Sequence, residues 1–380
     1  MTDFEAVEAL YDRYVAVWED ICNLESPTED KAAVDRVSAY IIGIAREHGW
    51  QVEVCPQAEA GDAVCITMNP HAPGTPVALS GHMDTVHPIG SFGTPAVHRD
   101  AEKIYGPGVT DCKGGLVVAL LAMHALEKTG FDERPVLLLL QSDEEGGSKQ
   151  SNKATIRYIC QRAQGVEAFI NLEGHTYGEA CLIRKGIATY TFTVTGVEAH
   201  SSRCAFEGAS AVAEAARKIL RLEELKDREG ITCNCGTVSG GSAVNTVPGQ
   251  CTFTANFRFV NEAQRLWIER FVQEVAADNR RPECTCTVEK TGSRLAMEDT
   301  PRNRALLDKM NAVFARVGLS PLAASARPGG SDAAEITAAG IPCVDNMGAA
   351  GDRIHSPDEF AYLDSLRENA CRLTALVRHL

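Results

Sequence analysis

The stretch Ser80-Gly81-His82-Met83-Asp84-Thr85-Val86 directly follows the apolar run Val77-Ala78-Leu79 and decides the fold. Turn-forming residues precede the run, so it predicts a short buried strand from Val77 to Met83. Side chains two positions apart in a strand point to the same side, which lets Asp84 orient His82. This pairing is typical of a metal-binding imidazole with its carboxylate partner, but a polar strand end with a satisfied histidine gives the same pattern.

The composition is typical of a globular protein, and the length predicts two domains. Its 380 residues exceed the size at which one hydrophobic core usually stops growing, and 44% of them are hydrophobic. The formal net charge of −14 argues against nucleic-acid and anionic-membrane partners, because phosphate-bearing surfaces attract basic patches. No apolar run approaches the roughly 20 residues that cross a bilayer, and we see no secretory signal. We therefore expect a cytoplasmic protein whose 14 cysteines are reduced.

The order of the predicted elements divides the chain. Strands alternate with helices over residues 1–183 and again over 295–380, which predicts an α/β domain with a mostly parallel sheet. Residues 184–294 follow the order β-α-β-β-α-β of a ferredoxin-like unit, beginning with the strictly alternating strand Thr189–Thr195. We expect this segment to be an inserted lid domain. Its free edge strand predicts pairing with a second copy in a homodimer.

Candidate metal ligands follow several of the predicted strands. Ligands of such sheets bind beyond the carboxyl ends of the strands, where these side chains would meet. Zinc accepts histidine nitrogen and carboxylate oxygen, and a catalytic zinc site leaves one position for water. The residues of these kinds at loops and strand ends are His82, Asp111, Glu144, Glu145, Glu173 and His355.

The cluster Asp143-Glu144-Glu145 ends the buried strand Val136–Gln141. Three carboxylates cannot all be buried there without a counter-charge, so we expect a cation nearby. One glutamate can bind a metal while the other faces a water as general base. Other adjacent acids, Asp358-Glu359 among them, are expected to lie on the solvated surface.

Six motifs occur along the chain in a fixed order. They are His82-x-Asp84, Gly108-x-x-Asp111-x-Lys113-Gly114-Gly115, Asp143-Glu144-Glu145-x-Gly147-Ser148, Glu173, Gly329-Gly330-Ser331-Asp332-Ala333 and His355-Ser356-x-x-Glu359. Together they resemble the co-catalytic zinc peptidase family of carboxypeptidase G, acetylornithine deacetylase, succinyl-diaminopimelate desuccinylase and aminoacylase. The resemblance spans nearly the whole chain. Gly174 departs from it, because proline is frequent at this position in the carboxypeptidase G branch.

The resemblance implies two zinc ions per chain, with cobalt and manganese as alternatives. Asp111 would bridge the ions. His82 and Glu173 would complete one site, and Glu145 and His355 the other.

The resemblance also implies the catalytic roles. Glu144 would be the general base, Asp84 would orient His82, and the Asp111-Cys112 peptide bond would be cis. His200 would reach into the partner subunit's site and stabilise the developing oxyanion, although a surface histidine at a strand end fits the same position.

Three further positions resemble the family's substrate-binding segments. Asn245 and Arg258 would hold the free carboxylate of the substrate, and Gly330 would offer backbone contacts. A salt bridge at the rim is the alternative for Arg258.

These observations predict a dizinc hydrolase that cleaves a peptide or an N-acyl amino-acid bond. An exopeptidase and a deacylase fit equally well, because the sequence does not describe the pocket beyond the metals. The alternative is a catalytically silent family member that binds peptides or amino acids as a dimer. The presence of every proposed ligand and of Glu144 argues against it.

Overall fold

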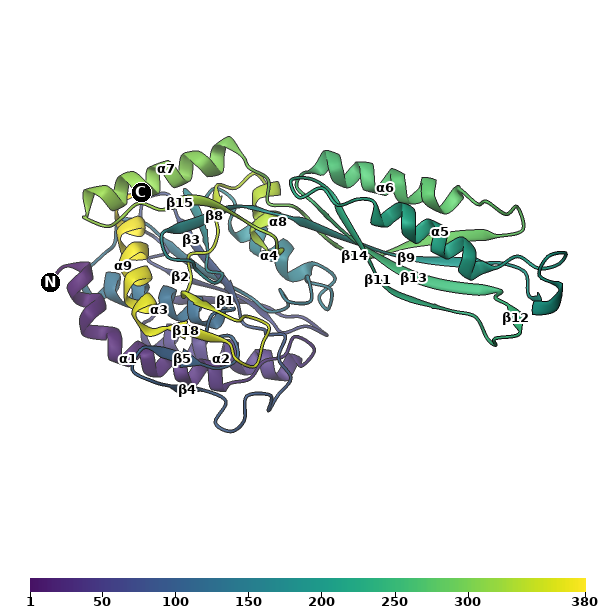
Figure 1. Cartoon of the computed structure of the whole chain (residues 1–380). Helices are drawn as coiled ribbons and strands as arrows, with labels where there is room; N and C mark the ends of the chain where they lie inside the picture. Colours follow the sequence, from purple (N-terminus) through teal and green to yellow (C-terminus); the bar gives the residue numbers. More distant parts are fainter. The chain divides into compact units, whose positions relative to one another are not determined.

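A computed structural model describes all residues from 1 to 380 (Figure 1). The chain forms two compact units. Unit 1 holds residues 1–182, 299–326 and 331–380, and unit 2 holds residues 183–298 and 327–330. The short segment 327–330, which the sequence assigns to the α/β domain, therefore groups with the inserted unit.

A six-stranded sheet forms the centre of unit 1 and confirms the predicted α/β class. Its strands, in spatial order, are β1 (Gln51–Cys55), β2 (Ala63–Met68), β6 (Val136–Gln141), β3 (Val77–His82), β7 (Ala168–Asn171) and β16 (Cys343–Val344). The pairs formed by β6, β3, β7 and β16 are parallel, whereas β1 and β2 are antiparallel. Every residue of β3 and β6 is buried, as expected for continuous apolar runs. β3 ends at His82, so Asp84 lies beyond the strand.

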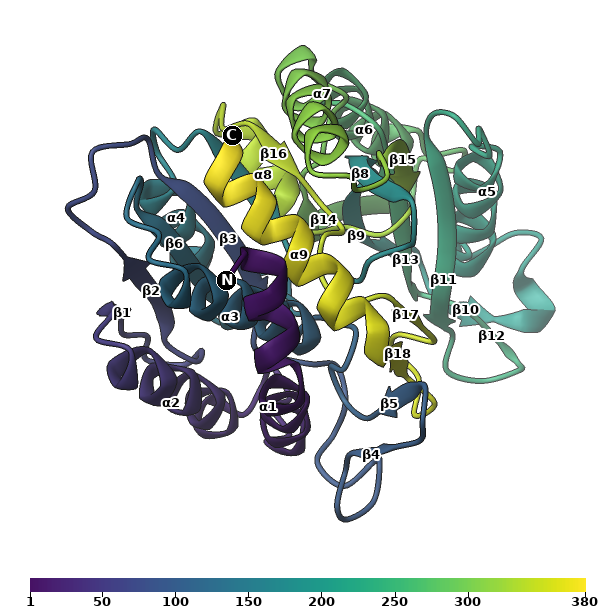
Figure 2. The same cartoon turned by 90° about the vertical axis from the view of Figure 1, so that its left-hand side faces the viewer.

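Seven helices belong to unit 1. They are α1 (Asp3–Asn23), α2 (Lys31–Glu47), α3 (Lys113–Lys128), α4 (Ala154–Arg162), α7 (Pro301–Arg316), α8 (Ala333–Ala338) and α9 (Leu363–His379). Side-chain caps at Thr2, Asp30 and Thr300 fix the starts of α1, α2 and α7. Helices α1, α3 and α9 pack against one another (Figure 2). None of the helices combines the length and the apolar character needed to span a membrane.

Short strands bring distant segments of unit 1 together. β4 (His98–Arg99), β5 (Lys103–Tyr105), β18 (Phe360–Tyr362) and β17 (Gly351–Asp352) form a small antiparallel sheet. Elsewhere β8 (Glu179–Arg184) pairs with β15 (Ala323–Arg327). Because β18 pairs with β5, the segment 355–359 lies next to the loop that follows β5.

Unit 2 has a four-stranded antiparallel sheet with two helices on one face (Figure 1). Its elements are β9 (Gly186–Thr195), β10 (Ala199–His200), the 3-10 turn Ser201–Arg203, α5 (Ala211–Glu223), β11 (Thr232–Gly240), β12 (Thr246–Val247), β13 (Gln250–Phe259), α6 (Glu262–Ala277) and β14 (Thr285–Arg294). The spatial order β11-β13-β9-β14 is that of a ferredoxin-like unit. Alternate residues of β9 and β13 fill its core, where Phe192 stacks on Phe253 at 4.7 Å.

Gly115 marks a close approach between α3 and the end of β7. A Cβ atom at Gly115 would lie 2.1 Å from the carbonyl oxygen of Leu172. We expect Gly115→Ala to lower the free energy of unfolding by about 2 kcal/mol or more, because backbone must move to relieve the overlap. Urea unfolding measures this change. In the control Gly43→Ala, where nothing lies within 4 Å in the interior of α2, stability should be unchanged or higher. Equal stabilities of the two variants would contradict the prediction.

Candidate metal centre

Asp111 lies in the loop between β5 and α3 and faces two histidines. Its Oδ1 is 3.1 Å from Nε2 of His82, and its Oδ2 is 3.1 Å from Nε2 of His355. His82 ends β3, whereas His355 precedes β18 and has a positive φ of 61°. A carboxylate whose two oxygens meet different imidazoles has the arrangement that a bridging metal ligand requires.

One glutamate lies near each of the two histidines that face Asp111. Oε1 of Glu173 is 3.8 Å from Nε2 of His82, and Oε2 of Glu145 is 3.3 Å from Nε2 of His355. Within each of these two groups the donor atoms lie within 4.8 Å of one another. The structure thus brings together the five residues that the sequence selects as ligands. Nitrogen and carboxylate donors in adjoining sets fit two zinc ions, so the residues present suit the implied metal pair.

Charge is concentrated in this cluster. The hydrogen bonds of His355 with Asp111 and Glu145 raise the pKa of His355 to about 10. Burial raises the pKa of Glu145 to about 7. Burial also opposes ionisation of Asp111, but the hydrogen bonds from His355 and His82 outweigh it and hold the pKa of Asp111 below its usual value. The carboxylates therefore attract positive charge, which divalent ions would supply in place of protons.

Asp84 connects the candidate base to the ligands. Its carboxylate accepts hydrogen bonds from the backbone N–H groups of Glu144 at 3.1 Å and Glu145 at 3.0 Å, and from the hydroxyl of Thr28 at 2.7 Å. Nδ1 of His82 lies 2.9 Å from the backbone oxygen of Asp84 and 3.4 Å from its carboxylate. The orientation of His82 thus involves the main chain of Asp84 as well as its side chain. The carboxylate mainly fixes the turn that carries both glutamates.

Glu359 corrects one expectation from the sequence. It is fully buried, not a member of a solvated acidic pair, whereas its neighbour Asp358 is exposed. Its carboxylate accepts hydrogen bonds from the backbone N–H groups of Gly108 at 3.2 Å, Thr110 at 2.8 Å and Asp111 at 3.0 Å. His87, for which the sequence assigns no definite role, lies 3.2 Å from the same carboxylate. Glu359 therefore positions the loop that carries Asp111.

Asp143 corrects the electrostatic argument made from the acidic cluster. Its buried carboxylate accepts hydrogen bonds from the hydroxyl of Thr155 at 2.6 Å and the backbone N–H of Ser151 at 2.9 Å. Local donors therefore stabilise this charge, and no cation is needed for it. Cys112 is also buried, which raises the pKa of its thiol to about 12 and keeps it protonated. The peptide bond between Asp111 and Cys112 is cis, as the resemblance implies.

Removal of the Glu359 charge should weaken the metal centre. We expect Glu359→Gln to lower metal affinity by about 10- to 100-fold, because residues that position ligands contribute on that scale. The glutamine amide would also place a donor against backbone donors. Competition with a chromogenic zinc chelator measures the affinity. The neighbouring exposed change Asp358→Asn is the control, and equal affinities of both variants would argue against a positioning role.

The remaining predicted residues belong to unit 2. His200, on β10, is exposed, and its Nδ1 lies 2.8 Å from the hydroxyl of Ser202. The carbonyl of Asn245 accepts a hydrogen bond from the backbone of Ser201 at 2.9 Å, so Asn245 lies beside the His200 segment. The guanidinium of Arg258, on β13, is 3.5 Å from the carbonyl of Pro328.

Gly330 lies among three arginines, of which only Arg258 has a role predicted from the sequence. Its carbonyl accepts a hydrogen bond from Arg184 at 3.3 Å, and a Cβ atom at Gly330 would lie 2.9 Å from Cδ of Arg294. Burial and the charge of Arg294 lower the pKa of Arg258. Arg184, Arg258 and Arg294 thus form a cationic corner of unit 2 around Gly330.

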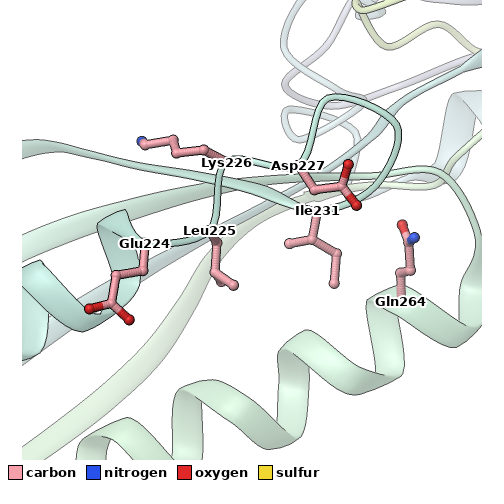
Figure 3. A pocket seen from close by; sticks show the side chains of 6 residues that line it. All are labelled: Glu224, Leu225, Lys226, Asp227, Ile231 and Gln264. Atoms are coloured by element: carbon pink, nitrogen blue, oxygen red, sulfur yellow. The ribbon is translucent and has the colours of Figure 1, made fainter.

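A hollow elsewhere in unit 2 does not contain any predicted site residue (Figure 3). Aliphatic and charged side chains line it together. The lining residues are Glu224, Leu225, Lys226, Asp227, Ile231 and Gln264. It offers no histidine, cysteine or pair of facing carboxylates that resembles a catalytic group.

A mainly parallel α/β unit with two donor groups sharing one aspartate is typical of two-metal hydrolases. Comparison with known families is consistent with this class. The chain belongs to peptidase family M20/M25/M40, whose model matches residues 78–379. The resemblance found in the sequence motifs is thereby confirmed.

Individual relatives extend the match over most of the chain. Carboxypeptidase G2 of Pseudomonas sp. (strain RS-16) is 25% identical and covers 95% of this chain and 87% of its own. Succinyl-diaminopimelate desuccinylase of Ruegeria pomeroyi is 29% identical over 74% of this chain and 77% of its own. Among solved structures, a dinuclear metal binding peptidase of Bacillus subtilis matches with a TM-score of 0.72 and 15% identity, covering 98% of this chain and all of its own. This last match concerns the fold alone.

Proposed function

We propose that the protein is a two-metal hydrolase that cleaves the amide bond of a small peptide or an N-acyl amino acid and releases a product with a free carboxylate. The observation that carries this proposal is the position of Asp111, which presents one carboxylate oxygen to His82 and the other to His355. The family supports metal-dependent hydrolysis, and the relatives include both a carboxypeptidase and a desuccinylase. This family membership does not favour the alternative of a catalytically silent binding protein.

The proposed roles follow from the donor set. Asp111 would hold both ions, with His82 and Glu173 as the further ligands of one and Glu145 and His355 as those of the other. Zinc is the proposed metal, with cobalt or manganese as substitutes, because these donors are imidazoles and carboxylates. When bound, the ions would polarise the substrate carbonyl and lower the pKa of a water molecule.

Glu144 is the proposed general base. It is buried, and its backbone N–H donates to Asp84, which holds the main chain of Glu144 next to the proposed ligand Glu145. It would take a proton from the attacking water and later deliver that proton to the nitrogen of the departing amine. The C–N bond breaks in this second step. The proton taken from the water thus ends on the amine, and Glu144 returns to its ionised form.

Unit 2 supplies the proposed recognition groups. His200 would stabilise the oxyanion, and Asn245 and Arg258 would hold the carboxylate of the substrate, with Gly330 providing backbone contacts. The cationic corner around Gly330 supports this assignment, because a guanidinium can bind a carboxylate through two parallel hydrogen bonds.

Metal analysis and a substrate pair test the proposed function. The purified chain should contain at least two zinc ions and should hydrolyse dipeptides or N-acetyl, N-succinyl or N-formyl amino acids. The preferred substrate is then compared with its C-terminal carboxamide. We expect the wild type to discriminate strongly against the carboxamide, and Arg258→Gln to lose most of this discrimination. A metal-free chain, or one without turnover on any of these compounds, would contradict the proposal.

A homodimer through unit 2 is proposed from the sheet edges. β11 and β14 are the two edge strands, and β14 carries charged residues that discourage pairing. β11 carries no charged residue, and its Val238 is exposed. β11 therefore offers the better edge for pairing with a second copy.

Mixing two inactive variants tests whether His200 acts across this dimer. His200→Ala and Glu144→Gln are each expected to be inactive as homodimers. A 1:1 mixture that exchanges subunits should recover about a quarter of the wild-type activity, because half of the dimers are mixed and each holds one complete site. Failure to recover activity after confirmed subunit exchange would exclude a shared site.

A further inference from the structure

A second group of metal-ligating side chains lies in unit 1, outside the candidate metal centre. His48 caps the end of α2, and His124 and Glu127 lie one turn apart on α3. Their donor atoms all lie within 4.8 Å of one another. His124 is eleven residues along α3 from its first residue Lys113, or about 16 Å along the axis. The group is therefore separate from Asp111 and its ligands.

The surroundings hold these side chains in place. Trp50 stacks on the ring of His48 at 4.8 Å, and the His48 side chain is only 11% exposed. On the other side, Nδ1 of His124 hydrogen-bonds with the hydroxyl of Tyr14 at 3.1 Å. The rings of the two histidines lie 4.2 Å apart. These contacts limit the rotation of both imidazoles and direct them toward each other.

One contact within the group already brings two donor atoms together. Nδ1 of His48 lies 2.5 Å from Oε2 of Glu127. Two imidazolium rings at 4.2 Å would repel each other, which favours a neutral ring with a free lone pair.

We propose that His48, His124 and Glu127 bind one divalent transition-metal ion in addition to the ions of the candidate metal centre. Two imidazoles and one carboxylate, with a fourth position open to water, form a donor set that zinc accepts. The ion would displace the proton shared by His48 and Glu127, and that proton would pass to solvent. The two donor atoms must then separate from 2.5 Å to about 3.3 Å to coordinate together. Glu127 can make this movement because its side chain is 36% exposed.

Such an ion would join two elements that are otherwise connected here by the contacts of His48 with Glu127 and His124. It would fix the end of α2 to the C-terminal part of α3, the helix that begins directly after the Asp111 loop. Arg13 carries a positive charge nearby, but Glu47 lies 3.6 Å from it and offsets that charge. The expected consequence is a more stable unit 1 in the presence of zinc.

Zinc content of the full chain tests the proposal. Metal ions are removed from the wild type, Glu127→Gln and His124→Gln with a chelator, and the proteins are dialysed against the same buffered concentrations of free zinc. Plasma emission spectroscopy then measures the zinc bound per chain. We expect each variant to bind one ion fewer than the wild type and to keep the wild-type turnover. Glu47→Gln removes a nearby exposed acid outside the group and should bind as many ions as the wild type.

Thermal unfolding gives a second readout on the same proteins. Added zinc should raise the unfolding midpoint of the wild type and of Glu47→Gln by a few degrees more than that of Glu127→Gln. Glu127 is partly exposed, so this variant should fold. Equal zinc content in wild type and Glu127→Gln would overturn the proposal. Because the readout is a difference of one ion, it is independent of whether the Asp111 centre is occupied.

Discussion

Glu144→Gln is expected to bind its metals as the wild type does and to lose turnover by about 10³-fold, because a glutamine cannot accept the proton of the attacking water. The replacement keeps the shape of the side chain, and the backbone of Glu144 remains hydrogen-bonded to Asp84. The folded structure should therefore be unchanged. Steady-state kinetics on the best substrate and metal content per chain, measured on one preparation, separate the loss of chemistry from a loss of ions.

Glu145→Gln is the matched control, since it makes the same chemical change at the next residue. Glu145 lies 3.3 Å from His355 and belongs to one of the donor groups, so this variant should lose metal affinity. Added zinc should then restore part of its activity, whereas it should not restore Glu144→Gln. If Glu144→Gln lost its metals and Glu145→Gln kept them, the roles of base and ligand would have to be exchanged.

The elements that could be predicted from the sequence are those whose local pattern agrees with their environment. β6 (Val136–Gln141) is a continuous apolar run between turn-forming residues, and it occupies the same residues in the structure. The alternating run Thr189–Thr195 likewise lies in a strand, β9 (Gly186–Thr195), which ends at the same residue. The helix α4 (Ala154–Arg162) was missed. It is short, and the residue before it, Lys153, has a left-handed conformation instead of a side-chain cap.

The side chains around Asp111 could be selected because parallel strands place their carboxyl ends at one edge of a sheet. Apart from Asp84, their supporting residues could not. Glu359 follows an exposed aspartate and looks like part of an acidic surface, yet it is buried by backbone donors almost 250 residues earlier in the chain. The pairing of β18 with β5 brings these two segments together, and the residues around Glu359 do not by themselves indicate that contact. Asp143 shows the converse, because nearby hydroxyl and amide groups solve a burial problem that the sequence analysis assigned to a metal.

Asp111→Asn is expected to remove both metals and to lower turnover by more than 10³-fold. The side chain of asparagine has one acceptor oxygen and one donor nitrogen. It could therefore act as a metal ligand only on the side of His82 or on the side of His355, not on both. It also removes the negative charge between ions that would lie roughly 3.5–4 Å apart, where their repulsion is strong. The loss should exceed that of Glu173→Gln, which affects one donor group only.

Asp143→Asn is the control for the general effect of neutralising a buried aspartate in unit 1. Its carboxylate is held by Thr155 and Ser151 and belongs to neither donor group. Asp143→Asn should lower the free energy of unfolding but keep the zinc content of the wild type. Zinc analysis, urea unfolding and kinetics on both variants distinguish the loss of a bridging ligand from a general loss of stability. Wild-type zinc content and near-normal turnover in Asp111→Asn would mean that the donor groups of His82 and His355 do not depend on a shared carboxylate, and the two-metal arrangement would have to be abandoned.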